Sequence, residues 1–250
     1  MAFLHNTDFF QLVAEGKMPA YQDYSGSGVN KDVDTGSTPE DIWLTGGVFV
    51  PPTTYRIHNI VSASANDTAA GTGARTVRVF GVTVNGLESE VVAMNGVTPV
   101  PTTKAYKDIY EMQVAVPGAG NTNAGIITAT AVTDATVTAT ILVDGLNTSR
   151  KAIRYIPTGY TGYLYDWNAG MEHATAGNSA GVYLLTKYDG EAWLSRGYHS
   201  LSNSGASYEI EHFKTPLVLP ADTWVKIQCT SVSANNTLIQ GGLNLMLKQD

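Results

Sequence analysis

The sequence predicts an all-β protein with two jelly-roll-like antiparallel β-sandwich domains, preceded by an extended N-terminal arm that carries a short helix. Short runs that alternate apolar and polar residues recur from residue 42 to the C-terminus, and clusters of Gly, Pro and Asn separate them at the spacing of a sandwich. After the arm, no run has the period of a helix. The 250 residues can hold two β domains, each with its own core.

Residues 1–36 differ from the rest of the chain and are predicted to form a docking arm. An N-capping residue near position 6 can start a helix of about two turns, and Gly16 can end it. The apolar residues that share one face of this helix are Phe9, Leu12 and Val13. Because a helix this short is marginal alone, we expect it to dock on another protein. The alternative is an arm that folds onto its own domain.

The alternating runs fall into two series, which define the two predicted domains. The first domain, residues 37–146, has predicted strands at 55–63, 75–84, 87–94, 106–116, 125–131 and 136–143. A turn-forming Asp-Gly-Leu-Asn sequence then interrupts the pattern. The second domain, residues 147–250, has predicted strands at 151–156, 161–171, 181–188, 191–199, 207–213, 223–231 and 238–247.

Two dipeptides, Asn85-Gly86 and Asp189-Gly190, predict tight hairpins of known register. Asn-Gly and Asp-Gly supply the two positive φ angles of a type I′ turn, so the residues on either side of the dipeptide should pair. The predicted pairs are Val84 with Leu87 at the first turn, and Tyr188 with Glu191 and Thr186 with Trp193 at the second.

Charge and hydropathy exclude two classes of partner. Charged residues make up only 15% of the chain and the net charge is −7 at pH 7. Since nucleic-acid affinity rests on clustered Lys and Arg, short basic spots such as Arg150, Lys151 and Arg154 predict no nucleic-acid partner. No run approaches the roughly 18 apolar residues of a membrane span, and the N-terminus has no basic region followed by an apolar core. We therefore expect no membrane partner and synthesis in the cytoplasm.

The sequence offers no convincing catalytic site, so we predict a non-enzymatic protein without a cofactor or a metal. The five histidines are scattered, without the spacing of a zinc site. Cys229 alternates with apolar residues and is predicted to be a buried structural thiol. Two carboxylate pairs have a spacing that suits glycosidase chemistry, Glu88 with Glu90 and Glu209 with Glu211. We read both pairs as solvent faces of strands, with Tyr208 and Ile210 on the buried side of the second.

An aromatic cluster in the second domain is the candidate binding surface. Tyr163, Tyr165 and Trp167 have the i, i+2 spacing that places side chains on one face of a strand. One interpretation is that they form the core or a subunit interface, since large aromatic residues suit the inner face of a sandwich. The other is that they form an exposed surface that binds glycan.

Five stretches carry a resemblance to a known family. The most informative is VSASANDTAAGTGARTVRVFG, residues 61–81, which joins a small-residue turn to an alternating strand. The others, in the order and spacing of the family, are DVDTGSTPEDIW (32–43), NTNAGIITAT (121–130), YIPTGYTGYLYDW (155–167) and SANNT (233–237). Over roughly residues 30–245 the chain resembles two-domain, all-β virion structural proteins of tailed bacteriophages.

The resemblance implies a virion protein, assembled in the cytoplasm of the host bacterium. It points first to a capsid decoration, or cement, protein that binds the outer head surface as a dimer or trimer, with the major capsid protein or other virion proteins as partners. The alternative is a head-fibre, tail or baseplate module that recognises host surface glycan through the aromatic residues of the second domain. A third class, a polysaccharide depolymerase, lacks a convincing acid pair and a long repetitive β-helix.

Overall fold

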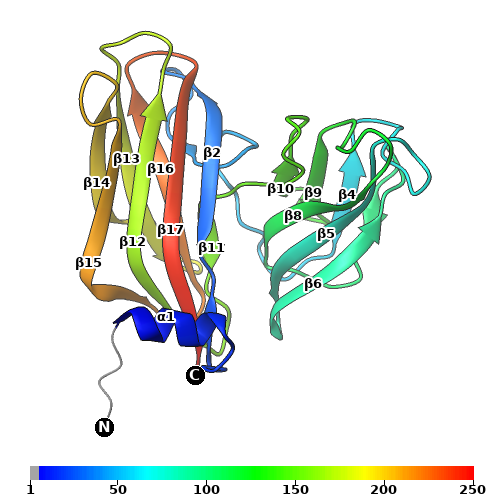
Figure 1. Ribbon diagram of the computed structural model, residues 1–250, viewed down its shortest axis with the longest axis horizontal. Helices are drawn as coiled ribbons and strands as arrows, with labels where there is room; N and C mark the ends of the chain where they lie inside the picture. Colours follow the sequence, from blue (N-terminus) through cyan, green and yellow to red (C-terminus); the bar gives the residue numbers. More distant parts are fainter. Residues whose placement is uncertain (1–5) are drawn as a thin grey trace.

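The computed structural model describes residues 6–250, and these residues form antiparallel β-sheets and one short helix. The prediction of an all-β protein is therefore confirmed. Figure 1 shows two bodies side by side, a taller one on the left that contains both ends of the described chain and a smaller one on the right. We call them the larger and the smaller sandwich.

The larger sandwich consists of two facing sheets. The first has the order β1-β17-β12-β15, with β2 also paired to β17, and its strands are β1 (Tyr21–Asp23), β2 (Gly26–Val33), β12 (Tyr160–Glu172), β15 (Tyr208–Leu219) and β17 (Thr237–Gln249). The second has the order β11-β16-β13-β14, with β3 also paired to β16, and its strands are β3 (Glu40–Asp41), β11 (Ile153–Tyr155), β13 (Ser179–Tyr188), β14 (Leu194–Ser202) and β16 (Thr223–Val232).

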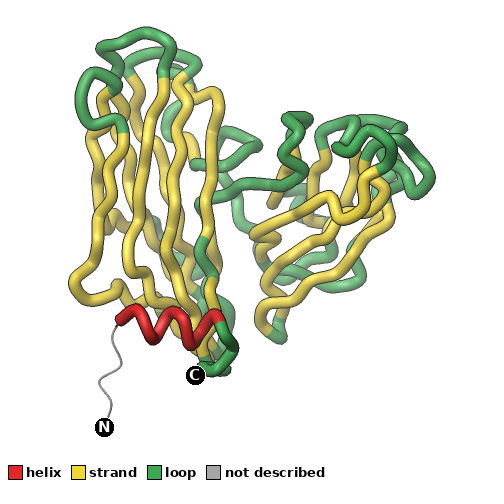
Figure 2. The backbone as a smooth tube through the Cα atoms, in the orientation of Figure 1, coloured by secondary structure: helices red, strands yellow, loops and turns green. Residues whose placement is uncertain are grey.

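The smaller sandwich lies between β3 and β11 in the chain and also has two sheets. One has the order β10-β9-β4-β7, from β4 (His58–Ser62), β7 (Val100–Pro101), β9 (Ile127–Ala131) and β10 (Val137–Ile141). The other has the order β6-β5-β8, from β5 (Ala74–Thr83), β6 (Gly86–Ala93) and β8 (Asp108–Pro117). The tube in Figure 2 shows that loops connect these short strands at both ends of the smaller sandwich.

The strand pairing changes the predicted division of the chain. We expected an arm at 1–36 and sequential domains at 37–146 and 147–250, but β1, β2 and β3 pair with β16 and β17 near the C-terminus. The larger sandwich is thus built from residues on both sides of the smaller one. The segment 21–41 shows no regular apolar alternation, and main-chain N–H and C=O groups pair it with β16 and β17, while Tyr24 and Val33 pack into the core.

The predicted helix is present and ends where expected. α1 spans Asn6–Ala14 and crosses the foot of the first sheet of the larger sandwich (Figure 1). Gly16 follows with a φ of 69°. Its N–H donates to the Val13 carbonyl and the Lys17 N–H donates to the Leu12 carbonyl. These two bonds form a Schellman motif, which stops the helix at a residue without a Cβ.

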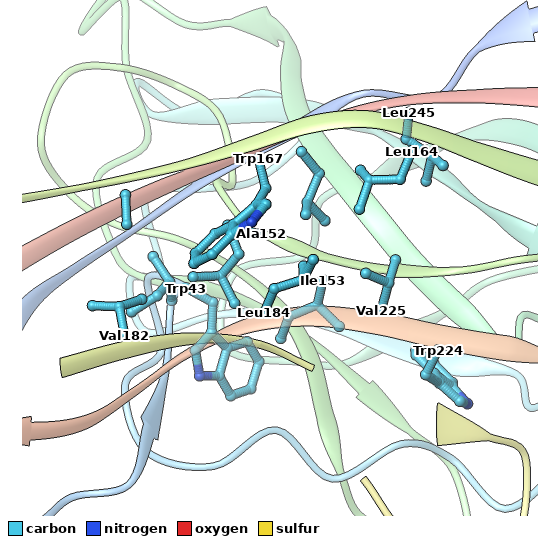
Figure 3. Close-up of a cluster of buried hydrophobic side chains, with 14 of the residues drawn as sticks. Trp43, Ala152, Ile153, Leu164, Trp167, Val182, Leu184, Trp224, Val225 and Leu245 are labelled. Carbon is cyan, nitrogen blue, oxygen red and sulfur yellow. The ribbon is translucent and has the colours of Figure 1, made fainter. Parts of the chain in front are cut away.

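Each sandwich has its own apolar core. In the larger sandwich, Leu164, Trp167 and Leu245 point from the first sheet toward Leu184 and Val225 of the second (Figure 3). All five are fully buried. A second, separate cluster around Ile60, Val79, Ile109, Met112 and Ile127 fills the smaller sandwich. The alternating runs of the sequence supply both cores, because every second residue of a strand faces the opposite sheet.

The predicted register of the first hairpin is wrong by two residues. Thr83 pairs with Gly86 and Val82 with Leu87, whereas we expected Val84 opposite Leu87. In this turn only Gly86 has a positive φ, of 99°, and Asn85 does not. Val84 and Asn85 therefore form the turn and Gly86 follows as a bulge, which is the three-residue alternative to a type I′ turn.

The second hairpin agrees with the prediction only at its tip. The Glu191 N–H donates to the Tyr188 carbonyl at 2.9 Å, so the expected turn is present. Thr186, however, pairs with Leu194 rather than with Trp193. Pairing resumes only at Leu194, and the register shifts between Leu184 and Leu185, where Arg196 is an extra residue on β14 without a partner on β13.

The cost of left-handed backbone at this turn can be measured with a matched pair of variants. Gly190 has a φ of 86°, Gly205 does not have a positive φ, and a Cβ at either position would meet no atom within 4 Å. We expect Gly190→Ala to lower the free energy of unfolding by about 1–2 kcal/mol and Gly205→Ala to leave it nearly unchanged. Urea denaturation checks this, and equal effects of the two variants would contradict the turn geometry.

Candidate functional site

The predicted aromatic surface is split by a bulge in β12. Leu164 pairs with Leu245, but Asp166 pairs with Asn244, so Tyr165 is an extra residue without a partner on β17. An extra residue reverses the alternation of side chains. Tyr163 and Tyr165 consequently stay half-exposed on the outer face, while Trp167 is fully buried between the sheets. The expectation that the three share one face is wrong.

Trp167 is the centre of a buried polar cluster in the larger sandwich. Its indole stacks on the His199 ring with centroids 3.9 Å apart, and its Nε1–H donates to Glu211 at 2.9 Å. His199 Nδ1 lies 2.9 Å from a carboxylate oxygen of Glu209. The indole N–H and one imidazole nitrogen are thus bound to the two carboxylates along the side of the sandwich where β14 faces β15, while His199 Nε2 has no hydrogen-bond partner among the described residues.

This cluster corrects the predicted orientation of β15. We expected Glu209 and Glu211 to face solvent, but both turn inward to the Trp167 cluster. Tyr208 and Ile210, expected inside, are 51% and 43% exposed. The other carboxylate pair is also engaged in hydrogen bonds: Glu88 accepts from Lys104 and Thr83, and these bonds lower its pKa below the ordinary value. A general acid needs a raised pKa, so this environment favours a permanently charged carboxylate.

The apolar residues of α1 contact their own chain. Val13 is buried, whereas Phe9 and Leu12 are half-buried. Phe9 packs edge-on against Tyr21, with ring centroids 5.1 Å apart, and its neighbour Phe10 packs in the same way against Tyr165. The helix thus covers the lower end of the first sheet, as in the alternative interpretation of the arm, and leaves part of its apolar face accessible.

The three basic residues of the short basic spot in the sequence lie at the junction of the two sandwiches. The Lys151 ammonium is buried and donates to the Asp108 carboxylate and to two carbonyl oxygens of the smaller sandwich. The Arg154 guanidinium is 5% exposed and donates to four carbonyl oxygens, including those of Tyr24 and Ser25. Arg150 lies nearby with a contact to Asp144 of 3.3 Å. Sequence spacing shows their proximity along the chain but not their burial.

A cleft of about 610 Å³ opens beside these cations. Its walls are β8 of the smaller sandwich, the segment from Thr148 to Arg154, and the outer face of β2, β12 and β17. A second hollow of about 390 Å³ continues along the same sheet face and shares Ser27, Arg150, Asn168 and Gly242 with the first. The sequence analysis did not predict this site, because its residues come from elements that lie far apart in the chain.

His58 is the histidine whose protonation the fold suppresses most clearly. It is fully buried on β4, and its Nδ1 lies 2.9 Å from the Arg56 carbonyl. Burial lowers its pKa from 6.5 to about 4. Burial likewise raises the pKa of the Cys229 thiol to about 11, which suits the predicted structural thiol.

Comparisons with known proteins do not assign a function. No family model matches the chain, and a search of curated proteins finds no match. Within residues 6–250 no group of three or more His, Cys, Asp or Glu side chains is placed to hold a metal ion. No helix in this part of the chain is long and apolar enough to cross a membrane. The function must therefore be argued from the fold and from surface geometry.

Because of the bulge, we expect alanine substitutions of Trp167 and Tyr165 to lower the free energy of unfolding by different amounts. Trp167→Ala should lower the free energy of unfolding by about 3–5 kcal/mol, because it leaves a large cavity and removes the partner of Glu211. Tyr165→Ala should cost about 1 kcal/mol or less, since its side chain is half-exposed. Chemical denaturation of both variants provides the measurement. A larger loss for Tyr165→Ala would contradict the placement of the bulge.

Burial of the neutral His58 side chain should make the free energy of unfolding depend on pH. Because the pKa in the folded state, about 4, lies below the unfolded value of 6.5, the unfolded chain binds the proton more readily. His58 therefore leaves stability intact above pH 6.5 and reduces it as the pH falls toward the folded pKa, by about 2 kcal/mol between pH 7 and 5. Between pH 7 and pH 5, the free energy of unfolding should decline less for His58→Gln than for the wild type. Equal declines for the two proteins would refute this assignment.

Proposed function

We propose that this protein is a non-enzymatic structural component of a tailed-bacteriophage virion, and that it acts as a capsid decoration protein. The observation that carries the proposal is the strand order of the larger sandwich. Along the chain, β2, β12, β15 and β17 enter one sheet, and β3, β13, β14 and β16 enter the other. This alternation supports a jelly-roll interpretation of the larger sandwich, an architecture common in viral capsid and lectin domains. Fold alone does not fix function.

The stretches that resemble the phage family support the proposal because two of them are joined by hydrogen bonds in the structure. Asp67, in the most informative stretch, is fully buried and accepts hydrogen bonds from the N–H groups of Ala74, Ala124 and Gly125. Ala124 and Gly125 belong to a second such stretch, NTNAGIITAT. The resemblance therefore includes a residue and the main-chain donors that it binds, which favours a common fold over a chance match in small polar residues.

The proposed partners are the major capsid protein or other virion proteins, and further copies of this chain in a dimer or trimer. The low charge content, 15%, and the rigid β construction suit a particle surface that is exposed to proteases. The accessible part of the α1 face, with Phe9 and Leu12, is the proposed contact to the capsid. In this proposal the protein needs no cofactor, reaches the virion in the host cytoplasm and binds neither nucleic acid nor membrane.

A truncation series tests the docking role of α1. Deletion of residues 1–16 removes the helix and leaves β1 and β2 in place, so the protein should stay folded but lose occupancy on particles. Deletion of residues 1–36 also removes two strands that pair with β17 and should unfold the larger sandwich. Circular dichroism and the amount of protein on purified particles are the readouts. Full occupancy after the shorter deletion would overturn the docking role.

The second candidate function is host glycan recognition by a head-fibre, tail or baseplate module. Exposed aromatic side chains of the larger sandwich favour it: Tyr188, Tyr198 and Tyr208 are 46%, 51% and 51% exposed, and Tyr163 and Tyr165 are half-exposed. Stripping the protein from particles separates the candidates. A decoration protein stabilises the shell by mass action, so stripped heads should lose DNA at a lower temperature and still adsorb to cells. Lost adsorption with unchanged heat resistance would favour the glycan module.

A further inference from the structure

We propose that the cleft between the two sandwiches is a binding site for an acidic saccharide, a sugar chain that carries carboxylate groups. The site is the continuous hollow formed by the two cavities of about 610 and 390 Å³. Volumes of this order are typical of small-molecule sites. The inference does not depend on the virion role, because it follows from the chemistry of the cleft and not from where the protein is carried.

The floor of the cleft is a trough on the outer face of the first sheet. One row across the sheet runs Ser27, Gly242, Asn168, since Gly242 pairs with Ser27 on one side and with Asn168 on the other. A Cβ on Gly242 would lie 2.7 Å from Asn168 Nδ2. The glycine thus makes room for the amide, which lies over the strand where a ligand can reach it.

The next row carries a second amide beside the trough. Asn244 pairs with Asp166, and its Nδ2 donates to the Asp166 carboxylate at 2.8 Å. This bond fixes the orientation of the Asn244 side chain, which leaves its Oδ1 as an acceptor. Amides and hydroxyls that both donate and accept match the hydroxyl groups of a sugar. Tyr110, on the opposite wall, adds an aromatic ring.

The charge of the walls points to an anionic ligand. Arg150, Lys151 and Arg154 line the larger cavity together with Glu111, and Lys31 and Glu172 line the smaller one. The Lys151 charge is matched by Asp108. Arg154, in contrast, donates to carbonyl oxygens, and no carboxylate of the described residues forms an ion pair with it. An uncompensated cation in a recess attracts negative charge more strongly than one in open solvent.

Arg150 is the group placed to bind the carboxylate directly. Arg150 Nη2 lies 3.3 Å from a carboxylate oxygen of Asp144. The Lys31 ammonium lies closer to the same oxygen, at 2.8 Å. Arg150 Nε is screened from solvent and has no hydrogen-bond partner among the described residues. The side chain as a whole is 29% exposed and lines both cavities, so a carboxylate in the cleft would form charge-assisted bonds to the accessible part of the guanidinium.

An acidic peptide is the main rival ligand, and the geometry favours the saccharide. Extended peptides gain affinity by pairing with a free sheet edge or by placing side chains in apolar pockets. Here the floor is the face of β12 and β17, which are paired on both sides, with β2 at the edge paired to β17 alone, and the row that lines it is Ser27, Gly242 and Asn168. The floor of the trough therefore offers side-chain amide and hydroxyl groups rather than apolar pockets, which suits the hydroxyl groups of a sugar chain better than the side chains of a peptide.

Calorimetric titration of the full chain with trigalacturonate tests the proposal, with maltotriose as the neutral comparison and a glutamate-rich hexapeptide as the rival. We expect binding of trigalacturonate alone. Arg150→Gln and Asn168→Ala should each weaken it at least about tenfold, while Arg78→Gln, which removes an exposed arginine from β5 of the smaller sandwich, should leave it unchanged.

Thermal unfolding of each variant shows whether lost binding comes from lost structure, and Asn168→Ala keeps the test decisive if Arg150→Gln does not fold. Equal binding of maltotriose would overturn the role of the cations. Preferential binding of the hexapeptide would replace the saccharide by a protein partner. No binding of any of the three, or binding that survives both groove variants, would overturn the site. Particle occupancy plays no part in these readouts, so their failure leaves the proposed virion role unaffected.

Discussion

The buried ammonium of Lys151 joins the two sandwiches, and the arrangement of the whole molecule depends on it. The chain enters the smaller sandwich after Trp43 and returns at Lys151, and these two residues pair across the junction. Lys151 then reaches into the smaller sandwich, where it binds Asp108 and the carbonyls of Ile109 and Thr138. Burial lowers the pKa of the ammonium, and Asp108 opposes that shift. Removing one partner would leave an unpaired buried charge, at a cost of about 3–5 kcal/mol.

A second buried pair lies beside the same junction, between two strands of the larger sandwich, β3 and β16. Asp41, next to the exit point, lies 2.7 Å from the Lys226 ammonium and also accepts from Gln228. Burial raises the Asp41 pKa above its ordinary value even though Lys226 opposes this. Lys107 adds a contact to Asp189 at 2.8 Å. Three lysine–aspartate pairs therefore lie around the junction, where Val82 of β5 also packs into the apolar core of the larger sandwich. Charge pairing and apolar contact together place the two sandwiches.

Sequence reasoning located most strands because the cores are filled by alternation. β5, predicted at 75–84, spans Ala74–Thr83, and β16, predicted at 223–231, spans Thr223–Val232. It missed β2, Gly26–Val33, because a polar strand with two glycines shows no alternation and is held by main-chain bonds to β17. It also misjudged the faces of β12, since a single extra residue at Tyr165 reverses inside and outside. The candidate aromatic site depended on that one residue.

The cleft could not be predicted for a related reason, because it is a product of the insertion. The chain leaves the larger sandwich after β3 and re-enters it at β11. Both strands pair with the same edge of β16, one after the other. Both connections thus leave from one edge of the larger sandwich, and this brings β8 opposite the outer face of β2 and β17. The cations that hold the junction then line an open space. In a chain of net charge −7, the constraint that fixes the two bodies is also what concentrates positive charge between them.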